Sequence, residues 1–168
     1  WRFNVNNLMS YKIGQGYDVH QLKVNLPLIL GGVKIDYHKG VVAHSDGDVL
    51  AHAIADSILG ALALGDIGQF FPENDKWKNA SGLMMLTHIK KLLITDNCQF
   101  IIQNIDSTII LQEPKLSSYI ELMRNNISNA LDIDISQISI KATTTDKLGF
   151  TGLGKGLAVE AICLIKNG

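Results

Sequence analysis

Two residues that can bind a metal ion stand two positions apart near the start of the chain. The segment GYDVH at residues 16–20 is typical of a strand, where side chains two residues apart point the same way. Asp18 and His20 could therefore direct a carboxylate and an imidazole at one point, a ligand pair that suits Zn²⁺. The alternative is a structural pair at a strand end, since an Asp-x-His motif alone is not specific.

A second imidazole belongs to His52, which lies among apolar neighbours in a stretch that predicts a helix over residues 49–64. The ordinary interpretation is a hydrogen-bonded core histidine. Asp56 follows four residues later on the same helical face and could fix the tautomer of His52 from outside a metal site. Together with Asp18 and His20, His52 would complete three protein ligands. The fourth zinc position would stay open, which indicates catalysis rather than structure.

The segment HSDGD at residues 44–48 places polar side chains directly before this predicted helix. Ser45 as the N-cap, with Asp48 three residues later, resembles a capping box. A helix N-terminus also attracts anions, phosphate included. A structural cap and a ligand-binding role can therefore hold together.

A second dense cluster, KATTTDKLGFTG at residues 141–152, follows from a predicted strand. Threonine hydroxyls and free backbone N–H groups can bind phosphate oxygens, and Asp146 can hold a hard divalent ion such as Mg²⁺ or Mn²⁺. The plain alternative is an edge strand, because β-branched residues favour strands. The sequence contains no GxxxxGK[ST] segment, which excludes a P-loop nucleotide site.

Two shorter segments are weaker candidates for a site. GDIG at residues 65–68 and the following loop to residue 75 could form a plain turn, but a turn alone does not explain acidic and glycine positions directly after a helix. Pro114 and Lys115 follow another predicted strand and could form a solvated turn.

The predicted elements give one α+β domain over residues 11–168, after an N-terminal leader at residues 1–10. We expect a mixed sheet with helices packed on one face, since strands occur before, between and after helices. Ser118 to Glu121 should form a capping box that opens the third helix. Strands are expected at 11–20, 26–35, 100–112, 137–144 and 157–166, with a turn at Gly31-Gly32, and helices at 49–64, 82–95 and 118–131.

Composition excludes several classes of protein. A net charge of -1 over 168 residues gives no basic excess for a nucleic acid. No apolar run approaches the length that spans a membrane, about 18 residues or more. The two cysteines, Cys98 and Cys163, make no disulfide framework. The hydrophobic fraction of 46% is slightly high and favours a subunit interface.

Residue usage suggests an AT-rich genome, because Asn and Ile are abundant and only Arg2 and Arg124 are arginines among 15 basic residues. The chain also begins with Trp1 rather than Met, as a processed form would. We therefore expect a plastid-type organelle (an apicoplast), with the cytoplasm of an AT-rich bacterium as the alternative.

Four blocks together resemble the 2-C-methyl-D-erythritol 2,4-cyclodiphosphate synthase family of the non-mevalonate isoprenoid pathway. They are GYDVH at 16–20, AHSDGDV at 43–49, ALGDIG at 63–68 with FP at 71–72, and KATTTDKLGFTG at 141–152. Their order and spacing are similar to that family from about Tyr11 to Lys166. The resemblance implies a ferredoxin-like subunit, and a homotrimer with active sites at the subunit interfaces. It also implies a lyase that converts 4-diphosphocytidyl-2-C-methyl-D-erythritol 2-phosphate into the cyclodiphosphate and CMP.

The resemblance also implies roles for individual residues. Zinc would be held by Asp18, His20 and His52, and the transition state would be stabilised by His44 and Thr144. Asp146 would hold the second divalent ion, although the family usually has Glu there. The methylerythritol phosphate pocket would be lined by Ser45, Asp66, Ile67, Gly68, Phe71, Pro72, Glu73, Asn74 and Asp75. The cytidine diphosphate half would be held from the adjacent subunit by Pro114, Lys115, Leu116, Thr143, Thr144 and Thr145.

One departure from the family concerns an axial cavity that can hold an isoprenoid diphosphate. The family usually has an arginine ring at its mouth, where this chain has Leu153. Phe150 should still present an apolar wall, but leucine offers nothing to an anion. The resemblance therefore implies weak binding of geranyl or farnesyl diphosphate here.

Two rivals to the cyclase remain open. A zinc phosphoesterase could use the same three ligands to activate water, although no clear general base stands beside them. A non-catalytic trimer could bind isoprenoid diphosphates in its core, although a pure binding shell would not need an open metal position.

Overall fold

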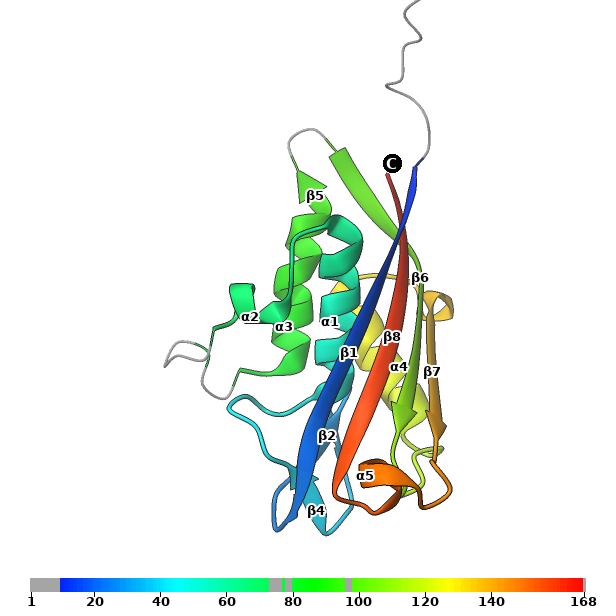
Figure 1. Cartoon of the computed structure of the whole chain (residues 1–168). Helices are drawn as coiled ribbons and strands as arrows, with labels where there is room; N and C mark the ends of the chain where they lie inside the picture. The colour runs from blue at the N-terminus through cyan, green and yellow to red at the C-terminus, as the bar shows by residue number, and fades with distance from the viewer. Residues whose placement is uncertain (1–9, 73–76, 78–79, 96–97, 168) are drawn as a thin grey trace, which may run out of the picture.

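The structure is a computed structural model that describes residues 10–72, 77, 80–95 and 98–167 (Figure 1). One sheet runs in the order β4-β1-β8-β6-β5, and β7 pairs beside β6. The β6–β7 pair is parallel and the other pairs are antiparallel. The strands are β1 (Tyr11–Val24), β4 (Lys39–Val41), β5 (Ile94–Thr95), β6 (Cys98–Ile110), β7 (Ile138–Thr143) and β8 (Gly156–Asn167), and a separate hairpin joins β2 (Leu28–Leu30) to β3 (Val33–Ile35).

The longer helices lie on one face of this sheet, which confirms the predicted mixed α+β arrangement (Figure 1). α1 packs against β1 and β8, α4 packs against β7, and α3 packs on α1 and α4. Of the helices described, none has both the length and the apolar character needed to cross a membrane. The helical elements are α1 (Val49–Leu62), α2 (Ile67–Phe70), α3 (Gly82–Lys90), η1 (Lys91–Leu93), α4 (Ile120–Leu131), η2 (Ile135–Gln137) and α5 (Gly149–Gly152).

Two glycines of β1 let the backbone of α1 rest directly on the strand. A Cβ atom on Gly14 would lie 1.8 Å from the carbonyl oxygen of Ser57, and one on Gly16 would lie 1.9 Å from that of Ala53. No side chain fits at such distances, so glycine is required for this close approach. The contact places the first turns of α1 beside the strand positions that follow Gly16.

Residues of β1 alternate between two very different environments. Gly14 and Gly16 are buried under the helices, and Asp18 and His20 share that face. On the opposite face the side chains of Ile13 and Tyr17 are exposed, by 71% and 52%. Ile162 of β8 is also exposed, by 50%. The helix-free face of the sheet therefore carries a substantial apolar surface.

Several predicted boundaries differ from the structure. The helix expected over residues 82–95 ends at Lys90, where η1 turns the chain into β5. Both predicted capping boxes are wrong. Asp48 itself caps α1 by accepting from the Ala51 N–H, and α4 begins after Tyr119 with no side-chain cap. A capping box occurs instead at η2, between Asp134 and Gln137.

Candidate active site

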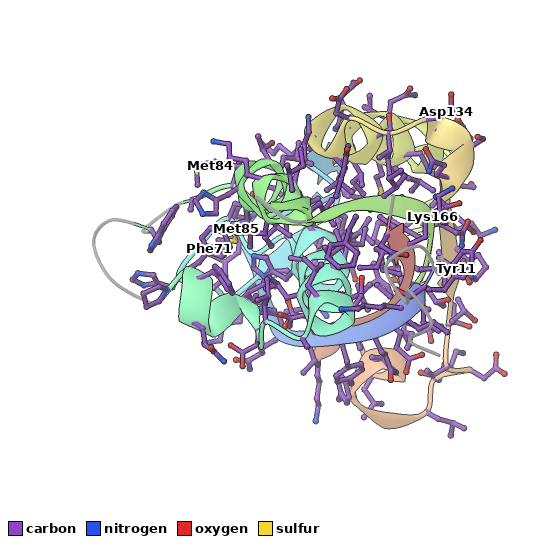
Figure 2. All side chains as sticks on the ribbon, turned by 90° about the horizontal axis from the view of Figure 1, so that it is seen from above. Tyr11, Phe71, Met84, Met85, Asp134 and Lys166 are labelled. Atoms are coloured by element: carbon purple, nitrogen blue, oxygen red, sulfur yellow. The ribbon has the colours of Figure 1, made fainter. Side chains whose placement is uncertain are left out.

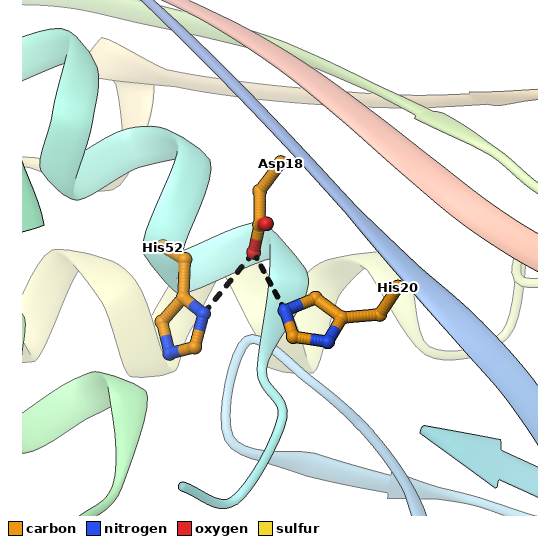
Figure 3. Close-up of side chains that lie close together, drawn as sticks. All are labelled: Asp18, His20 and His52. Carbon is orange, nitrogen blue, oxygen red and sulfur yellow. Dashed lines mark hydrogen bonds and ion pairs between the residues drawn. The ribbon is translucent and has the colours of Figure 1, made fainter. Parts of the chain in front are cut away.

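The carboxylate of Asp18 brings together two imidazoles from different elements (Figure 3). Its Oδ2 atom lies 3.4 Å from Nε2 of His20 on β1 and 3.1 Å from Nδ1 of His52 on α1. One ligand atom from each of the three residues lies within 4.8 Å of the others. The residues therefore fit a metal ion that accepts mixed nitrogen and oxygen ligands.

Hydrogen bonds orient both rings of this metal-binding triad. Nδ1 of His20 lies 3.0 Å from the carbonyl oxygen of Val42, so it must donate. In the neutral ring, Nε2, which faces Asp18, therefore carries the lone pair that a metal would use. The other nitrogen of His52, Nε2, lies 3.5 Å from Oγ of Ser45. The ring of His52 is thus placed between Asp18 and Ser45.

The charges of the triad favour an ionised carboxylate. Burial alone would raise the pKa of Asp18, but hydrogen bonds and charge interactions with His20 and His52 outweigh burial and hold the pKa well below its usual range. The hydrogen bond to Asp18 in turn raises the pKa of His20, against the effect of its burial. An ionised carboxylate is the form that binds a cation.

The triad opens into a cavity of about 190 Å³, the triad cavity. Phe71 and Met85 both line its wall, on the side of the molecule away from Tyr11 and Lys166 in the view of Figure 2. The predicted residues that line the cavity with the triad are His44, Ser45, Ile67, Gly68, Phe71 and Pro72. Glu73, Asn74 and Asp75 lie outside the described residues.

Other residues of this region differ from the sequence predictions. Ala43, Trp77 and Met85 also line the cavity, and sequence reasoning missed them because isolated apolar and aromatic residues carry no chemical signal. Asp66 does not line the cavity; its Oδ1 caps α2 by accepting from the Gln69 N–H at 3.2 Å.

Asp56 does not hydrogen-bond to His52, contrary to the prediction. Its Oδ1 accepts from the backbone N–H of Ile67 at 2.8 Å. The two nitrogens of His52 contact Asp18 and Ser45 instead. The four-residue spacing of His52 and Asp56 lies within α1 as predicted, but the Asp56 carboxylate binds the backbone of Ile67, which follows the end of α1.

The two aspartates of HSDGD hold the loop that carries His44 and Ser45. Asp48 is fully buried and accepts from the N–H groups of Gly31, Gly32 and Ala51 at 2.7–3.0 Å. Burial raises its pKa, against the lowering effect of these bonds. Asp46 accepts from the N–H of Gly82 at 3.0 Å. This loop is therefore fastened to the β2–β3 turn and to the start of α3.

A second cavity, of about 510 Å³, lies where β6 and β7 end. It gathers most of the residues predicted to bind the cytidine diphosphate half, and we call it the threonine pocket. Thr145 does not line it, because its hydroxyl bonds to the Leu148 carbonyl and to the Thr151 hydroxyl. Asp146 is exposed in the next turn, with φ 50°. The lining residues are Leu111, Gln112, Pro114, Lys115, Leu116, Ser117, Ile120, Ala142, Thr143 and Thr144.

The two cavities lie on different strands of the sheet. The triad cavity is built on β1, and the threonine pocket on β7, with β8 and β6 between them. Three strand spacings of about 4.8 Å separate β1 from β7 by roughly 14 Å. Within one chain the triad and Thr144 therefore belong to separate cavities.

Comparison with known proteins identifies relatives over nearly the whole chain. The family model described as YgbB family matches residues 11–166. The 2-C-methyl-D-erythritol 2,4-cyclodiphosphate synthase of Clostridium perfringens is 55% identical over 155 residues, which cover 92% of this chain and 98% of that protein. The protein of the same name from Francisella tularensis subsp. novicida is 54% identical over 159 residues, covering 94% and 99%.

Solved structures agree with these matches. Bifunctional IspDF from Campylobacter jejuni superposes with a TM-score of 0.90 at 42% identity; the match covers 96% of this chain but only 43% of that longer protein. IspF from Plasmodium falciparum in complex with CDP gives a TM-score of 0.80 at 42% identity, covering 92% and 95%. The curated relatives with identities of 54–56% are bacterial, so the expected plastid-type organelle finds no support among them.

Proposed function

The chain belongs to the YgbB family, and from this membership we propose that it is a cyclodiphosphate synthase. It converts 4-diphosphocytidyl-2-C-methyl-D-erythritol 2-phosphate into 2-C-methyl-D-erythritol 2,4-cyclodiphosphate and CMP. The curated relatives carry the name of this activity over 98–99% of their length. The observation that carries the proposal is the metal-binding triad, which opens into a cavity lined by a polar loop and the start of a helix.

Asp18, His20 and His52 are the residues that would hold the metal ion, for which zinc is the best match to one carboxylate and two imidazoles. When bound, zinc supplies positive charge that polarises phosphate oxygens and offsets charge that develops in the transition state. The Asp18 carboxylate stays ionised because of its two histidine partners. The hydrogen bond from His20 to Val42 keeps its Nε2 lone pair directed at the site.

The reaction needs positioning more than it needs a nucleophilic side chain. An oxygen of the substrate's 2-phosphate attacks the β-phosphorus, a new P–O bond forms, and the bond to the α-phosphate oxygen breaks with its electrons leaving on CMP. Water is not consumed. Such a step is catalysed mainly by holding two anionic groups in line and neutralising their charge. His44 and Ser45 lie at the triad cavity, where they can donate to phosphate oxygens.

The cytidine half of the substrate is proposed to bind in the threonine pocket, where Thr144 would stabilise the transition state. Solved relatives bound to CDP support a cytidine nucleotide as ligand. Lys115 and the threonines supply a charge and hydroxyl groups for the diphosphate. Asp146, beside that pocket, would hold Mg²⁺ or Mn²⁺ together with substrate oxygens.

A homotrimer of ferredoxin-like subunits would bring the two cavities together across each interface. The separation of β1 from β7 argues that one chain does not suffice. The exposed apolar side chains of Ile13, Tyr17 and Ile162 offer a surface that association would bury. The axial cavity of such a trimer would bind an isoprenoid diphosphate only weakly, since Leu153 is 61% exposed and brings no charge. Calorimetry with geranyl diphosphate measures this affinity.

Phosphorus NMR of the chain with its proposed substrate, zinc and Mg²⁺ tests the function. We expect resonances of the cyclic diphosphate and of CMP to appear together. Release of free phosphate would identify a phosphoesterase instead. An unchanged spectrum with the metal bound would indicate a binding protein.

A further inference from the structure

α2 forms one wall of the triad cavity and packs on the core only through two partly buried side chains, Ile67 and Phe70. This four-residue helix buries none of its residues, although Ile67 and Gly68 line the cavity. Phe71, which follows α2, is buried and anchors that end. With only this partial packing at its start, α2 also depends on polar contacts there.

The N–H group of Ile67 is the first of this helix and has no intrahelical acceptor, as holds for the first N–H groups of any helix. The N-cap residue Asp66 accepts from Gln69 and not from Ile67. The acceptor for Ile67 is Oδ1 of Asp56, at 2.8 Å. Because Asp56 lies one turn after His52 on α1, this bond ties the cavity wall to the helix that carries a metal ligand.

Among the described contacts, the hydrogen bonds of the His52 ring go to residues other than Asp56, which interacts with His52 only through charge. Nδ1 of His52 lies 3.1 Å from the Asp18 carboxylate, and Nε2 lies 3.5 Å from the Ser45 hydroxyl. Both ring nitrogens are thus engaged by other residues. Loss of the Asp56 side chain should leave the ring of His52 where it is.

We propose that Asp56 is a positioning residue that fixes α2 opposite the metal ligands, so that it acts on substrate binding rather than on metal binding. This inference rests on the proposed function for the identity of the substrate. The bond sets the distance between the backbone at Ile67 and Gly68 and the triad across the cavity. A wall that is free to move would bind the methylerythritol phosphate end of the substrate less tightly, whatever the state of the metal.

The test compares Asp56→Ala with Asp56→Asn, whose side-chain oxygen can still accept from Ile67. Zinc per chain, amide hydrogen exchange at residues 67–69 and steady-state kinetics are measured for both. In Asp56→Ala we expect unchanged zinc content, while exchange at Ile67 and KM each rise about tenfold through the lost hydrogen bond. A smaller change in kcat is expected, since uniform binding is lost. Asp56→Asn should restore most of the exchange protection and of KM.

Two results would overturn the inference. One is loss of zinc from Asp56→Ala with unchanged exchange at Ile67, which would make Asp56 a support for the metal ligands. The other is unchanged exchange at Ile67 with zinc retained. If Asp56→Ala does not fold, Asp56→Glu, which keeps the charge but displaces the carboxylate, must show the same faster exchange with zinc retained. Zinc content and exchange need no substrate, so failure of the wild-type chain to form cyclic diphosphate would contradict only the proposed function.

Discussion

The triad cavity and the threonine pocket are built in opposite ways. The triad cavity is small, about 190 Å³, and its wall segments are tied down by buried or half-buried carboxylates that accept backbone N–H groups. The threonine pocket has about 510 Å³, and the side chains of Thr143 and Lys115 are exposed. One chain therefore assembles all three residues of the candidate metal site, whereas the threonine pocket presents exposed side chains.

Close backbone packing positions the side chains of the first region. Gly14 and Gly16 place α1 on β1, which brings Nδ1 of His52 within 3.1 Å of the Asp18 carboxylate. In the threonine pocket, the hydroxyl of Thr143 donates to the neighbouring carbonyl of Thr144. Preorganised groups contribute most to catalysis where charge must be stabilised.

The largest effect should follow from breaking the metal-binding triad. His52→Ala removes one of three ligands, so the protein should lose most of its zinc, expected at about one ion per chain. Activity should fall roughly 1,000-fold or more, because a metal contributes several kcal/mol to transition-state stabilisation. Metal analysis of chelator-free protein and kcat/KM check both. Full zinc occupancy in the variant would show that His52 is not a ligand.

A smaller effect is expected from separating α1 from β1. Gly16→Ala places a Cβ 1.9 Å from the Ala53 carbonyl oxygen, and overpacking against a backbone should lower the free energy of unfolding by about 3 kcal/mol. Gly60→Ala is the matched control on α1, since its Cβ would meet nothing closer than 3.7 Å. The control should be neutral or slightly stabilising, as alanine favours helices. Equal denaturation midpoints for the two variants would contradict this account of the packing.

The smallest effect is expected from Asp146, in the turn that follows the strand of the threonine pocket. Asp146→Ala should reduce activity about tenfold, the consequence of losing one contact between charged groups. The remaining activity should depend less on added Mg²⁺, while zinc content stays unchanged because the triad lies on β1 and α1. Titration of the rate against Mg²⁺ in both proteins measures this. An unaltered Mg²⁺ dependence at full rate would remove Asp146 from the site.

Much of the metal-binding half could be predicted from the sequence, because its signals are local. Two-residue spacing put Asp18 and His20 on one face of β1, and the apolar surroundings of His52 indicated a buried histidine. The acceptor roles of Asp48 and Asp56 were not predictable. Their partners at Gly31, Gly32 and Ile67 are backbone N–H groups brought near by the fold, and backbone groups have no residue-specific signal.

The same limit applies to the helix ends and to the threonine cluster. The apolar pattern continued past Lys90 because η1 and β5 are also apolar, so periodicity alone predicted too long a helix. Sequence proximity suggested that Thr143, Thr144 and Thr145 act together. The turn after β7 instead directs the hydroxyl of Thr145 to Thr151 and Leu148.

Mixing two inactive variants tests most directly whether a complete site needs two chains. His52→Ala has a defective triad and an intact threonine pocket, and Thr144→Ala has the reverse. If sites form between subunits, exchange of subunits creates some sites with neither lesion, and the mixture should regain cyclodiphosphate-forming activity that neither variant has alone. Each variant incubated by itself is the control, and mass spectrometry of the assembled protein confirms the exchange. Absence of any recovery after confirmed exchange would contradict the division of the site between two chains.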